Sequence, residues 1–230
     1  MSFTVTEGEI LGVIGPNGAG KTTLLNCISR VYGLDGGEIV FDRVSLARLG
    51  PQQVARLGVG RTFQIVQPFA AMTVRENVAT GGLFGSDRAR MPLREAFAWA
   101  DEVLQIVGLA DKGSRVANEL TVPDRKRLEV ARALATRPRL LLLDEVMAGL
   151  NMTEVDQALE LVRRIRAGGV TVVLIEHVMR VIVGVCERVL VLNLGRVLVE
   201  GPPADVLRDE RVVEAYLGER YGQRLAGHKR

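Results

Sequence analysis

Apolar runs of strand length recur along the chain and indicate its architecture. Ile10–Ile14, Leu140–Leu143 and Val170–Ile175 are almost unbroken apolar runs. Such runs are typical of parallel strands that helices cover on both faces. Further strands are expected at Glu38–Asp42 and Gly58–Phe63. Because segments with helical spacing separate the runs, the pattern predicts an α/β fold with a mostly parallel sheet.

The middle of the chain has a different pattern. Between Val78 and Pro138 the strand-like runs disappear, and apolar residues recur at helical spacing over Arg94–Val107 and Asp124–Thr136. We therefore expect a helical subdomain inserted into a single domain. The expected divisions of that domain are a core (1–77 and 138–217), a helical subdomain (78–137) and a basic tail (218–230).

The C-terminal part predicts a β-hairpin and short helices. Val189–Leu192 and Arg196–Glu200 are joined through Asn193-Leu194-Gly195, which is a turn signal. Short helices are expected around 204–207 and 212–217. The basic tail is expected to be a solvated, partly disordered end, with contact to anionic lipid as the alternative.

Composition narrows the function classes. The net charge of +3 comes from 30 basic and 27 acidic residues mixed along the chain, so charge gives no support to nucleic-acid binding. The two cysteines, Cys27 and Cys186, lie in apolar stretches, which fits buried thiols in a reducing compartment. The first residues lack the features of a signal peptide, and no apolar run approaches the roughly 18 residues that span a bilayer. A cytoplasmic location is expected, and any membrane path must come from another chain.

A glycine-rich segment after the first apolar run has the pattern of a phosphate-binding loop. It lies between a predicted strand and the predicted helix Thr22–Ser29, and its residues are Gly15-Pro16-Asn17-Gly18-Ala19-Gly20-Lys21-Thr22. The glycines let the loop curl so that backbone N–H groups converge on phosphate oxygens, and the helix N-terminus adds its positive dipole end. Lys21 is expected to reach the β and γ phosphates, and Thr22 to hold magnesium. Thr23 adds a hydroxyl close by. The alternative is a glycine-rich turn with a chance lysine.

Two carboxylates follow the apolar run at Leu140–Leu143. Asp144 is expected to hold magnesium through water, and Glu145 to polarise the attacking water as general base. The alternative is that both acids are merely solvated at a strand end.

His177 and Gln64 complete the candidate catalytic set. His177 comes just past the run Val170–Ile175, so it is expected at the sheet edge where ligands bind, within reach of the γ-phosphate and the attacking water. A lone histidine is more often structural. Gln64 follows the strand expected at Gly58–Phe63, and from there its side chain would contact magnesium and water and report ATP to the helical subdomain. Gln67 is the competing candidate for this position.

Taken together, the motifs resemble the nucleotide-binding subunits of ATP-binding-cassette transporters over nearly the whole chain. The resemblance rests on the order of phosphate loop, glutamine loop, helical insertion, signature, acidic strand and histidine. Shorter segments look like the branched-chain amino-acid importer subgroup, among them Arg61-Thr62-Phe63-Gln64, Met72–Asn77, Arg127–Arg132, Ala148–Asn151 and Ala215–Gly218.

This resemblance implies an ATP-hydrolysing motor subunit with a P-loop NTPase fold that uses ATP and Mg²⁺. It also implies a second ATP-binding-cassette subunit, transmembrane permease subunits and indirectly a solute-binding protein, with this chain peripheral on the inner face of the cell membrane. In the expected head-to-tail dimer, ATP lies between one chain's phosphate loop and the other chain's signature.

The sequence departs from the family pattern at the signature and at the inter-subunit loop. The signature, usually Leu-Ser-Gly-Gly-Gln, is here Leu120-Thr121-Val122-Pro123-Asp124. Thr121 keeps a hydroxyl, Pro123 has no N–H to offer a γ-phosphate, and Asp124 is expected to cap the following helix. Because the signature acts across the dimer, this loss should weaken the partner's site and favours a heterodimer. Asn151 stands where many members have aspartate, so the loop that couples the two sites loses a charge.

A further departure concerns the N-terminal side of the phosphate loop. Family members normally have about two strands before this strand, with an aromatic residue that stacks on adenine. This chain starts too late to include them, and Phe3 is expected to be a core residue. We therefore expect weaker and less base-selective nucleotide binding, or a truncated start.

Two rival functions are open at this point. One is a soluble ATPase of the same superfamily that acts on DNA or ribosomes, but the sequence shows no coiled-coil insertion, second cassette or basic patch. The other is an ATP-binding regulatory subunit with little or no hydrolysis of its own. The altered signature favours it, whereas Lys21, Asp144, Glu145 and His177 oppose it.

Overall fold

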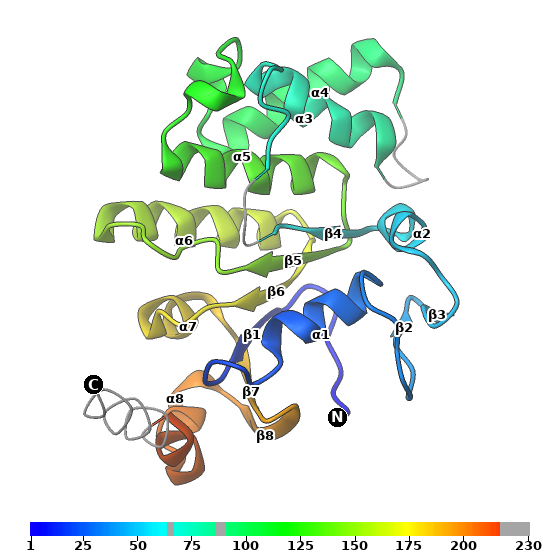
Figure 1. Cartoon of the computed structure of the whole chain (residues 1–230). Helices are drawn as coiled ribbons and strands as arrows, with labels where there is room; N and C mark the ends of the chain where they lie inside the picture. Colours follow the sequence, from blue (N-terminus) through cyan, green and yellow to red (C-terminus); the bar gives the residue numbers. More distant parts are fainter. Residues whose placement is uncertain (64–66, 86–90, 217–230) are drawn as a thin grey trace, which may run out of the picture.

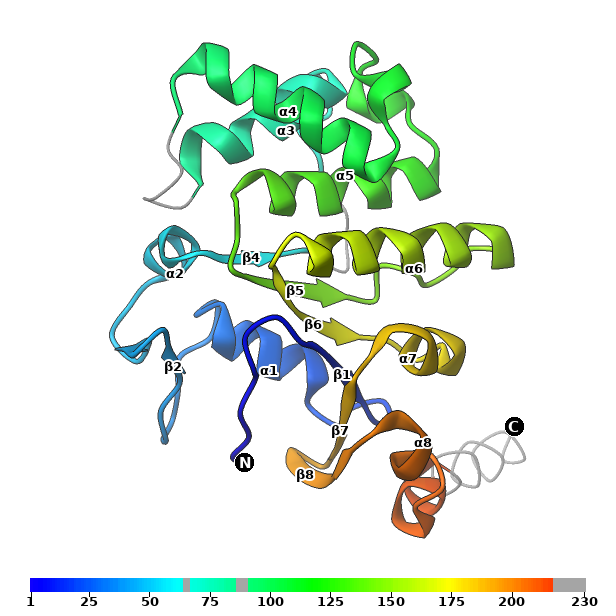
Figure 2. The ribbon, with the colours of Figure 1, turned by 180° about the vertical axis from the view of Figure 1, so that it is seen from behind.

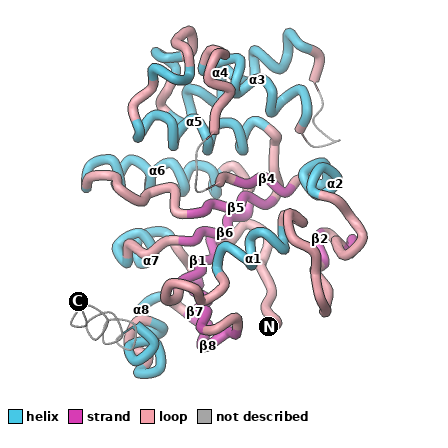
Figure 3. The backbone as a smooth tube through the Cα atoms, viewed as in Figure 1, coloured by secondary structure: helices cyan, strands magenta, loops and turns pink. Residues whose placement is uncertain are grey.

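The computed structural model describes residues 1–63, 67–85 and 91–216, and Figures 1 and 3 show its elements. The strands are β1 (Ile10–Ile14), β2 (Val40–Phe41), β3 (Val44–Ser45), β4 (Val59–Arg61), β5 (Leu140–Asp144), β6 (Thr171–Ile175), β7 (Arg188–Asn193) and β8 (Arg196–Gly201). The helices are α1 (Lys21–Ile28), α2 (Pro51–Leu57), α3 (Val74–Phe84), α4 (Leu93–Val107), α5 (Val122–Ala135), α6 (Met152–Ala167), α7 (Met179–Val185) and α8 (Pro203–Val206). Short 3₁₀ turns lie at Ala110–Lys112 and Ala117–Glu119, and residues 210–216 are again helical.

The main sheet has the strand order β4-β5-β6-β1-β7-β8. All neighbours in it are parallel except β8, which pairs antiparallel with β7. Alternate residues of the strands enter two hydrophobic clusters: Ile14 and Leu143 pack on the side of α4 to α7, and Val13 and Leu142 pack with α1 and α2. Both faces of the sheet are therefore covered, which explains why its strands are apolar at nearly every position.

Three helices form a layer of their own above α6, as Figures 1 and 2 show from opposite sides. α3, α4 and α5 pack against one another. The first of them begins at Val74, where Thr73 and Glu76 form a reciprocal capping box, a feature that fixes a helix start. The helical part of the fold thus starts a few residues before Val78. Among the described residues, no helix has the length and apolarity needed to cross a bilayer.

The strand expected at Glu38–Asp42 is shorter and lies outside the main sheet. Only Val40 and Phe41 are in strand conformation, and they pair with β3 alone. Asp42 and Arg43 both have positive φ, 49° and 65°, as a two-residue hairpin turn requires. The turn reverses the chain at once, and Val40 is left exposed.

The predicted C-terminal hairpin is present as β7 and β8. Its turn has positive φ at Leu194 and Gly195, and the Gly195 N–H donates a hydrogen bond to the Ala19 carbonyl at 3.0 Å. This contact brings the hairpin turn against the loop between β1 and α1.

Candidate nucleotide site

The glycine-rich loop joins β1 to α1 in the conformation that the motif predicts. Gly15, Gly18 and Gly20 all have positive φ, at 149°, 76° and 99°, which side chains other than glycine rarely adopt. Gly20 is also the N-cap of α1 and supplies no side-chain hydrogen bond to the helix start. The first N–H groups of α1 are therefore left without a side-chain cap, the arrangement in which a helix N-terminus binds an anion.

Lys21 lies inside this loop. Its side chain is buried, and Nζ donates hydrogen bonds to the carbonyls of Gly15 at 2.7 Å and Pro16 at 3.0 Å. Thr22 and Thr23 are exposed at the start of the helix, as are Asn17 and Gly18 in the loop. The ammonium is thus held over the loop, and the two threonine hydroxyls are accessible to a ligand.

Asp144 ends β5 in a buried position. Its Oδ2 lies 3.4 Å from Arg61 Nη2, whereas its Oδ1 is buried with no hydrogen-bond partner among the described residues. Burial raises the pKa of this carboxyl, although the charges of Arg61 and Lys21 act in the opposite direction. Arg61 also donates to Asn26 Oδ1 at 2.7 Å and Ser29 Oγ at 2.8 Å, so it ties the acid to α1.

Glu145 and His177 meet beside Asp144. Glu145 Oε1 lies 3.4 Å from His177 Nδ1, with the Glu145 side chain 18% exposed and the histidine 49% exposed. Glu145 has a φ of 51°, a left-handed conformation that is unfavourable for this residue type and is found preferentially at functional sites. Its N–H donates to the Ile175 carbonyl at 3.0 Å, which fixes the backbone at the end of β5 next to β6.

Three charged residues that support this edge, Arg61, Glu176 and Lys126, are not among the site residues predicted from the sequence. Besides Arg61, Glu176 is 1% exposed, and its Oε1 accepts a hydrogen bond from the Met147 N–H at 2.8 Å. Burial raises the pKa of Glu176. The position of Glu176, between an apolar strand and His177, was the available signal. Lys126 of α5 donates to the Ala148 carbonyl. Glu176 and Lys126 therefore both fix the backbone just after Glu145.

Gln64 lies outside the described residues, but its neighbourhood is described. Thr62 Oγ1 accepts a hydrogen bond from the Asp144 N–H at 3.1 Å. The Gln67 carbonyl accepts one from Arg132 Nη1 at 3.0 Å. Arg132 also pairs with Glu129 at 3.1 Å. Thr62 is thus joined to β5, and Gln67 is joined to α5.

The signature segment forms the start of α5, and here one expectation is wrong. Thr121, not Asp124, is the N-cap. Its Oγ1 accepts from the Asp124 N–H at 3.4 Å and donates to Asp124 Oδ2 at 2.9 Å. Asp124 is buried and also accepts from Lys112 Nζ at 2.6 Å. The helix begins earlier than expected because Pro123 lies in its first turn, where the missing N–H breaks no helical hydrogen bond.

Asn151 caps the start of a different helix. It is the N-cap of α6, where Oδ1 accepts from the Glu154 N–H at 3.0 Å and its own N–H donates to Glu154 Oε2 at 2.9 Å. Thr121, Asp124 and Asn151 line one open hollow on the protein surface, whereas Val122 is 67% exposed. The structure therefore brings the signature and the inter-subunit loop together.

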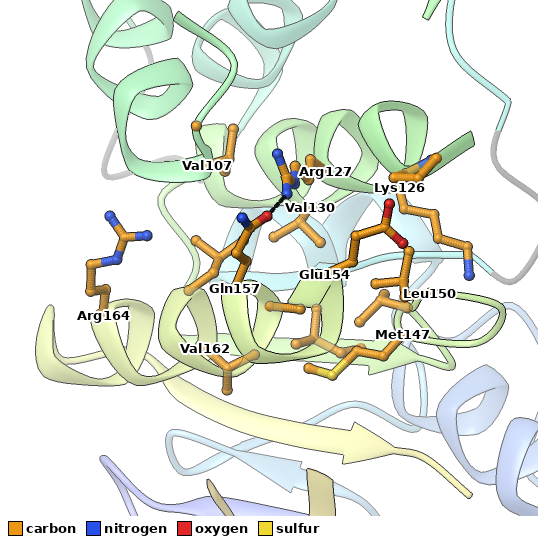
Figure 4. A pocket seen from close by; sticks show the side chains of 16 residues that line it. Val107, Lys126, Arg127, Val130, Met147, Leu150, Glu154, Gln157, Val162 and Arg164 are labelled. Carbon is orange, nitrogen blue, oxygen red and sulfur yellow. Dashed lines mark hydrogen bonds between the residues drawn. The ribbon is translucent and has the colours of Figure 1, made fainter. Parts of the chain in front are cut away.

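A second, more enclosed hollow lies between α5 and α6 (Figure 4). Met147 and Leu150 contribute to its apolar wall, and Arg127 and Gln157 are hydrogen-bonded to each other at its rim. The residues of the phosphate loop do not line it. It is thus separate from the phosphate loop, although its wall includes the segment that follows Glu145.

In a single chain the phosphate loop and the signature do not meet. Both face the same side of the molecule, but α6 and α7 lie between the start of α5 and the loop before α1 (Figures 1 and 2). A phosphate bound at the loop of one chain would therefore need a second chain to reach a signature segment.

Comparisons with known proteins agree with this geometry. The sequence model of the "ABC transporter" family matches residues 1–148, and that of the "Branched-chain amino acid ATP-binding cassette transporter" family matches residues 196–222. The high-affinity branched-chain amino acid transport ATP-binding protein LivG of Salmonella typhimurium is 40% identical over 231 aligned positions, covering 95% of this chain and 91% of the relative.

Solved structures give the same result. The ADP conformation of MJ1267, an ATP-binding cassette of an ABC transporter, is 30% identical with a TM-score of 0.82 and covers 95% of this chain and 91% of its own. A dimeric post-hydrolysis state of the ATP-binding cassette MJ0796, bound to ADP and Pi, is 28% identical with a TM-score of 0.79 and covers 87% and 88%.

The fold and the site define an ATP-binding cassette. The chain belongs to the ABC transporter family. It is an ATPase subunit of such a transporter, a class that operates as paired cassettes together with membrane permease subunits.

Proposed function

We propose that this chain powers an importer of branched-chain or related amino acids. The C-terminal family match and the similarity to LivG support this solute class. In the proposed assembly the chain lies in the cytoplasm on the inner face of the membrane, bound to the permeases. A solute-binding protein acts on the outer side. The chain itself never meets the solute, so its part is to couple ATP hydrolysis to uptake.

The observation that carries the catalytic proposal is the convergence of four side chains at one sheet edge. Buried Lys21 and buried Asp144 lie close enough for the lysine charge to lower the pKa of the acid, and Glu145 and His177 are in contact beside them. Lys21 and the loop N–H groups bind the phosphates. Glu145 accepts the proton of the attacking water, and His177 holds Glu145 in place and hydrogen-bonds the γ-phosphate.

The same edge fits a magnesium ion. Asp144 Oδ1 is buried without a partner among the described residues, and carboxylate and hydroxyl oxygens are ligands that Mg²⁺ prefers. We propose that Thr22 and Asp144, the latter through water, hold the ion, with Gln64 as a further ligand. When bound with ATP, magnesium neutralises charge on the phosphates.

We further propose that the partner cassette is a different chain. Thr121 uses its hydroxyl to cap α5 and to bind Asp124, and Pro123 has no N–H. Both features reduce the number of hydrogen-bond donors that this signature can direct at ATP in the partner's site. In a heterodimer, one site combines this chain's phosphate loop with a signature of the usual family sequence from the partner.

The altered signature also favours a second candidate, an ATP-binding regulatory subunit with little hydrolysis of its own. ATP turnover by a dimer whose partner cassette is inactivated at its own catalytic acid distinguishes the two functions. ATP turnover that persists in this dimer comes from the present chain and supports the motor role. Loss of all turnover, with ATP still bound, supports the regulatory role.

Uptake in reconstituted liposomes tests the transport proposal. The vesicles contain the permeases, both cassettes and the solute-binding protein, and uptake of labelled leucine is measured with and without internal ATP. Uptake should require ATP and this chain, should be lost in Lys21→Ala, and should persist in Arg163→Ala, which removes an exposed charge on α6. Leucine uptake that survives omission of this chain contradicts the proposal.

A further inference from the structure

The C-terminal part of the chain contacts the phosphate loop at three points. The Leu192 carbonyl lies so close to Gly15 that a Cβ added there would be 2.1 Å from its oxygen. The Gly195 N–H donates to the Ala19 carbonyl. The third contact comes from the helical residues 210–216: the Gly15 N–H donates a hydrogen bond to Tyr216 Oη at 2.8 Å.

Gly15 is held at both of its peptide groups. Its N–H is bound to Tyr216, and its carbonyl accepts from Lys21 Nζ at 2.7 Å. With Leu192 packed against it, the residue has little room to move, and its φ of 149° is available only to glycine. The tyrosine hydroxyl, Gly15 and the Lys21 ammonium thus form a connected series that ends at the proposed phosphate site.

We propose that Tyr216 is a positioning residue for the phosphate loop. It acts through Gly15 and keeps the empty loop and Lys21 in the conformation that binds phosphate. Without the hydroxyl, the Gly15 N–H loses its acceptor and the loop is less restrained, so the ligand must order it on binding, which lowers affinity. The inference rests on the proposed function, because it assumes that the loop binds the phosphates of ATP.

The ring of Tyr216 has a separate, structural role. It is partly buried against the larger hydrophobic cluster, next to the helices that cover that face of the sheet. Tyr216→Phe keeps this packing and removes only the hydroxyl. The variant therefore separates positioning of the loop from stability of the C-terminal helix.

The experiment measures the affinity of the purified full-length chain for ATP and for inorganic tripolyphosphate, together with the unfolding temperature. Tripolyphosphate has no base, so it reports on the loop alone. The controls are Val213→Ala, an exposed position on the same helix, and Val103→Ala, a buried position in α4. Lys21→Ala tests the proposed phosphate site itself.

Tyr216→Phe should weaken both ligands by a similar factor of roughly 3 to 10, the equivalent of one hydrogen bond, while the unfolding temperature changes little. Val213→Ala should behave as wild type, and Val103→Ala should lower the unfolding temperature by several degrees with affinity retained. Unchanged affinity in Tyr216→Phe, a loss for ATP only, or a loss matched by a fall in stability overturns the positioning role. If Lys21→Ala binds both ligands as wild type does, the proposed phosphate site fails as well.

Discussion

The sheet edge at the ends of β1, β5 and β6 has charged residues in buried positions. In the hollow lined by Thr121, Asp124 and Asn151, here called the signature hollow, polar residues instead cap the starts of helices. Lys21, Asp144 and Glu176 are each at most 8% exposed, and among the described residues Asp144 Oδ1 and Glu176 Oε2 have no hydrogen-bond partner. Thr121 and Asn151 are N-caps with their hydrogen bonds satisfied within the chain. Burying unpaired charge is costly, so the first region is organised for a ligand and the second for local stability.

The two regions therefore respond differently to substitution. Changes at the sheet edge should alter nucleotide binding and turnover more than stability, or should even relieve a cost of folding. Changes at the signature hollow should alter stability first, and the chain's own nucleotide affinity very little, because a signature acts on the site of the partner.

The largest effect is expected for Lys21→Ala. The variant removes a buried ammonium that the loop carbonyls hold in place, and hydrogen bonds to charged groups contribute roughly 1.5–3 kcal/mol each. ATP affinity should fall roughly 100-fold, as measured by titration calorimetry, with Arg163→Ala as the charge-loss control. Affinity within a factor of two of wild type would place the phosphates elsewhere.

Thr121→Val tests the other region. The hydroxyl caps α5 and binds Asp124, so its loss should lower the free energy of unfolding by about 1 kcal/mol. ATP affinity of the isolated chain should stay within about twofold. Urea unfolding and nucleotide titration on the same preparation check both values. A large loss of affinity with stability unchanged would show that Thr121 serves the chain's own site.

Glu176→Gln should stabilise the protein at neutral pH. Because burial raises the pKa of Glu176 in the folded state, the folded protein binds this proton more tightly than the unfolded chain does. The penalty is absent below the unfolded pKa and grows as pH rises toward the folded pKa. The variant keeps the acceptor for the Met147 N–H, so its gain in the free energy of unfolding should appear in urea unfolding at pH 7.5 and shrink toward pH 4. A pH-independent loss would contradict this account.

The smallest effect is expected for Asn151→Asp. Asparagine and aspartate are equally good N-caps, and Asn151 already forms a complete capping box with Glu154. The free energy of unfolding should change by less than about 0.5 kcal/mol, whereas Asn151→Ala should lose about 1 kcal/mol. If the aspartate variant is as destabilised as the alanine variant, the capping role is wrong.

The same contrast explains what the sequence could predict. The strands β1, β5 and β6, the glycine-rich loop and the β7–β8 hairpin follow from local patterns, so their positions were accurate to within a residue or two. The contact of Arg61 with Asp144 joins residues 83 positions apart, and no local pattern contains it. Asp124 was expected to cap α5, but Thr121 is the N-cap, because proline is well tolerated in a first helical turn and the helix includes Pro123.

The most direct test of the sheet edge as the catalytic centre is magnesium-dependent ATP turnover by the purified chain with its partner cassette inactivated, comparing wild type with Glu145→Gln. Glu160→Gln, which changes an exposed acid on α6, is the matched control. The account predicts that turnover falls roughly 10²- to 10⁴-fold in Glu145→Gln, with ATP still bound, and stays at the wild-type value in Glu160→Gln. Turnover that is equal in wild type and Glu145→Gln would contradict the assignment of Glu145 as the general base.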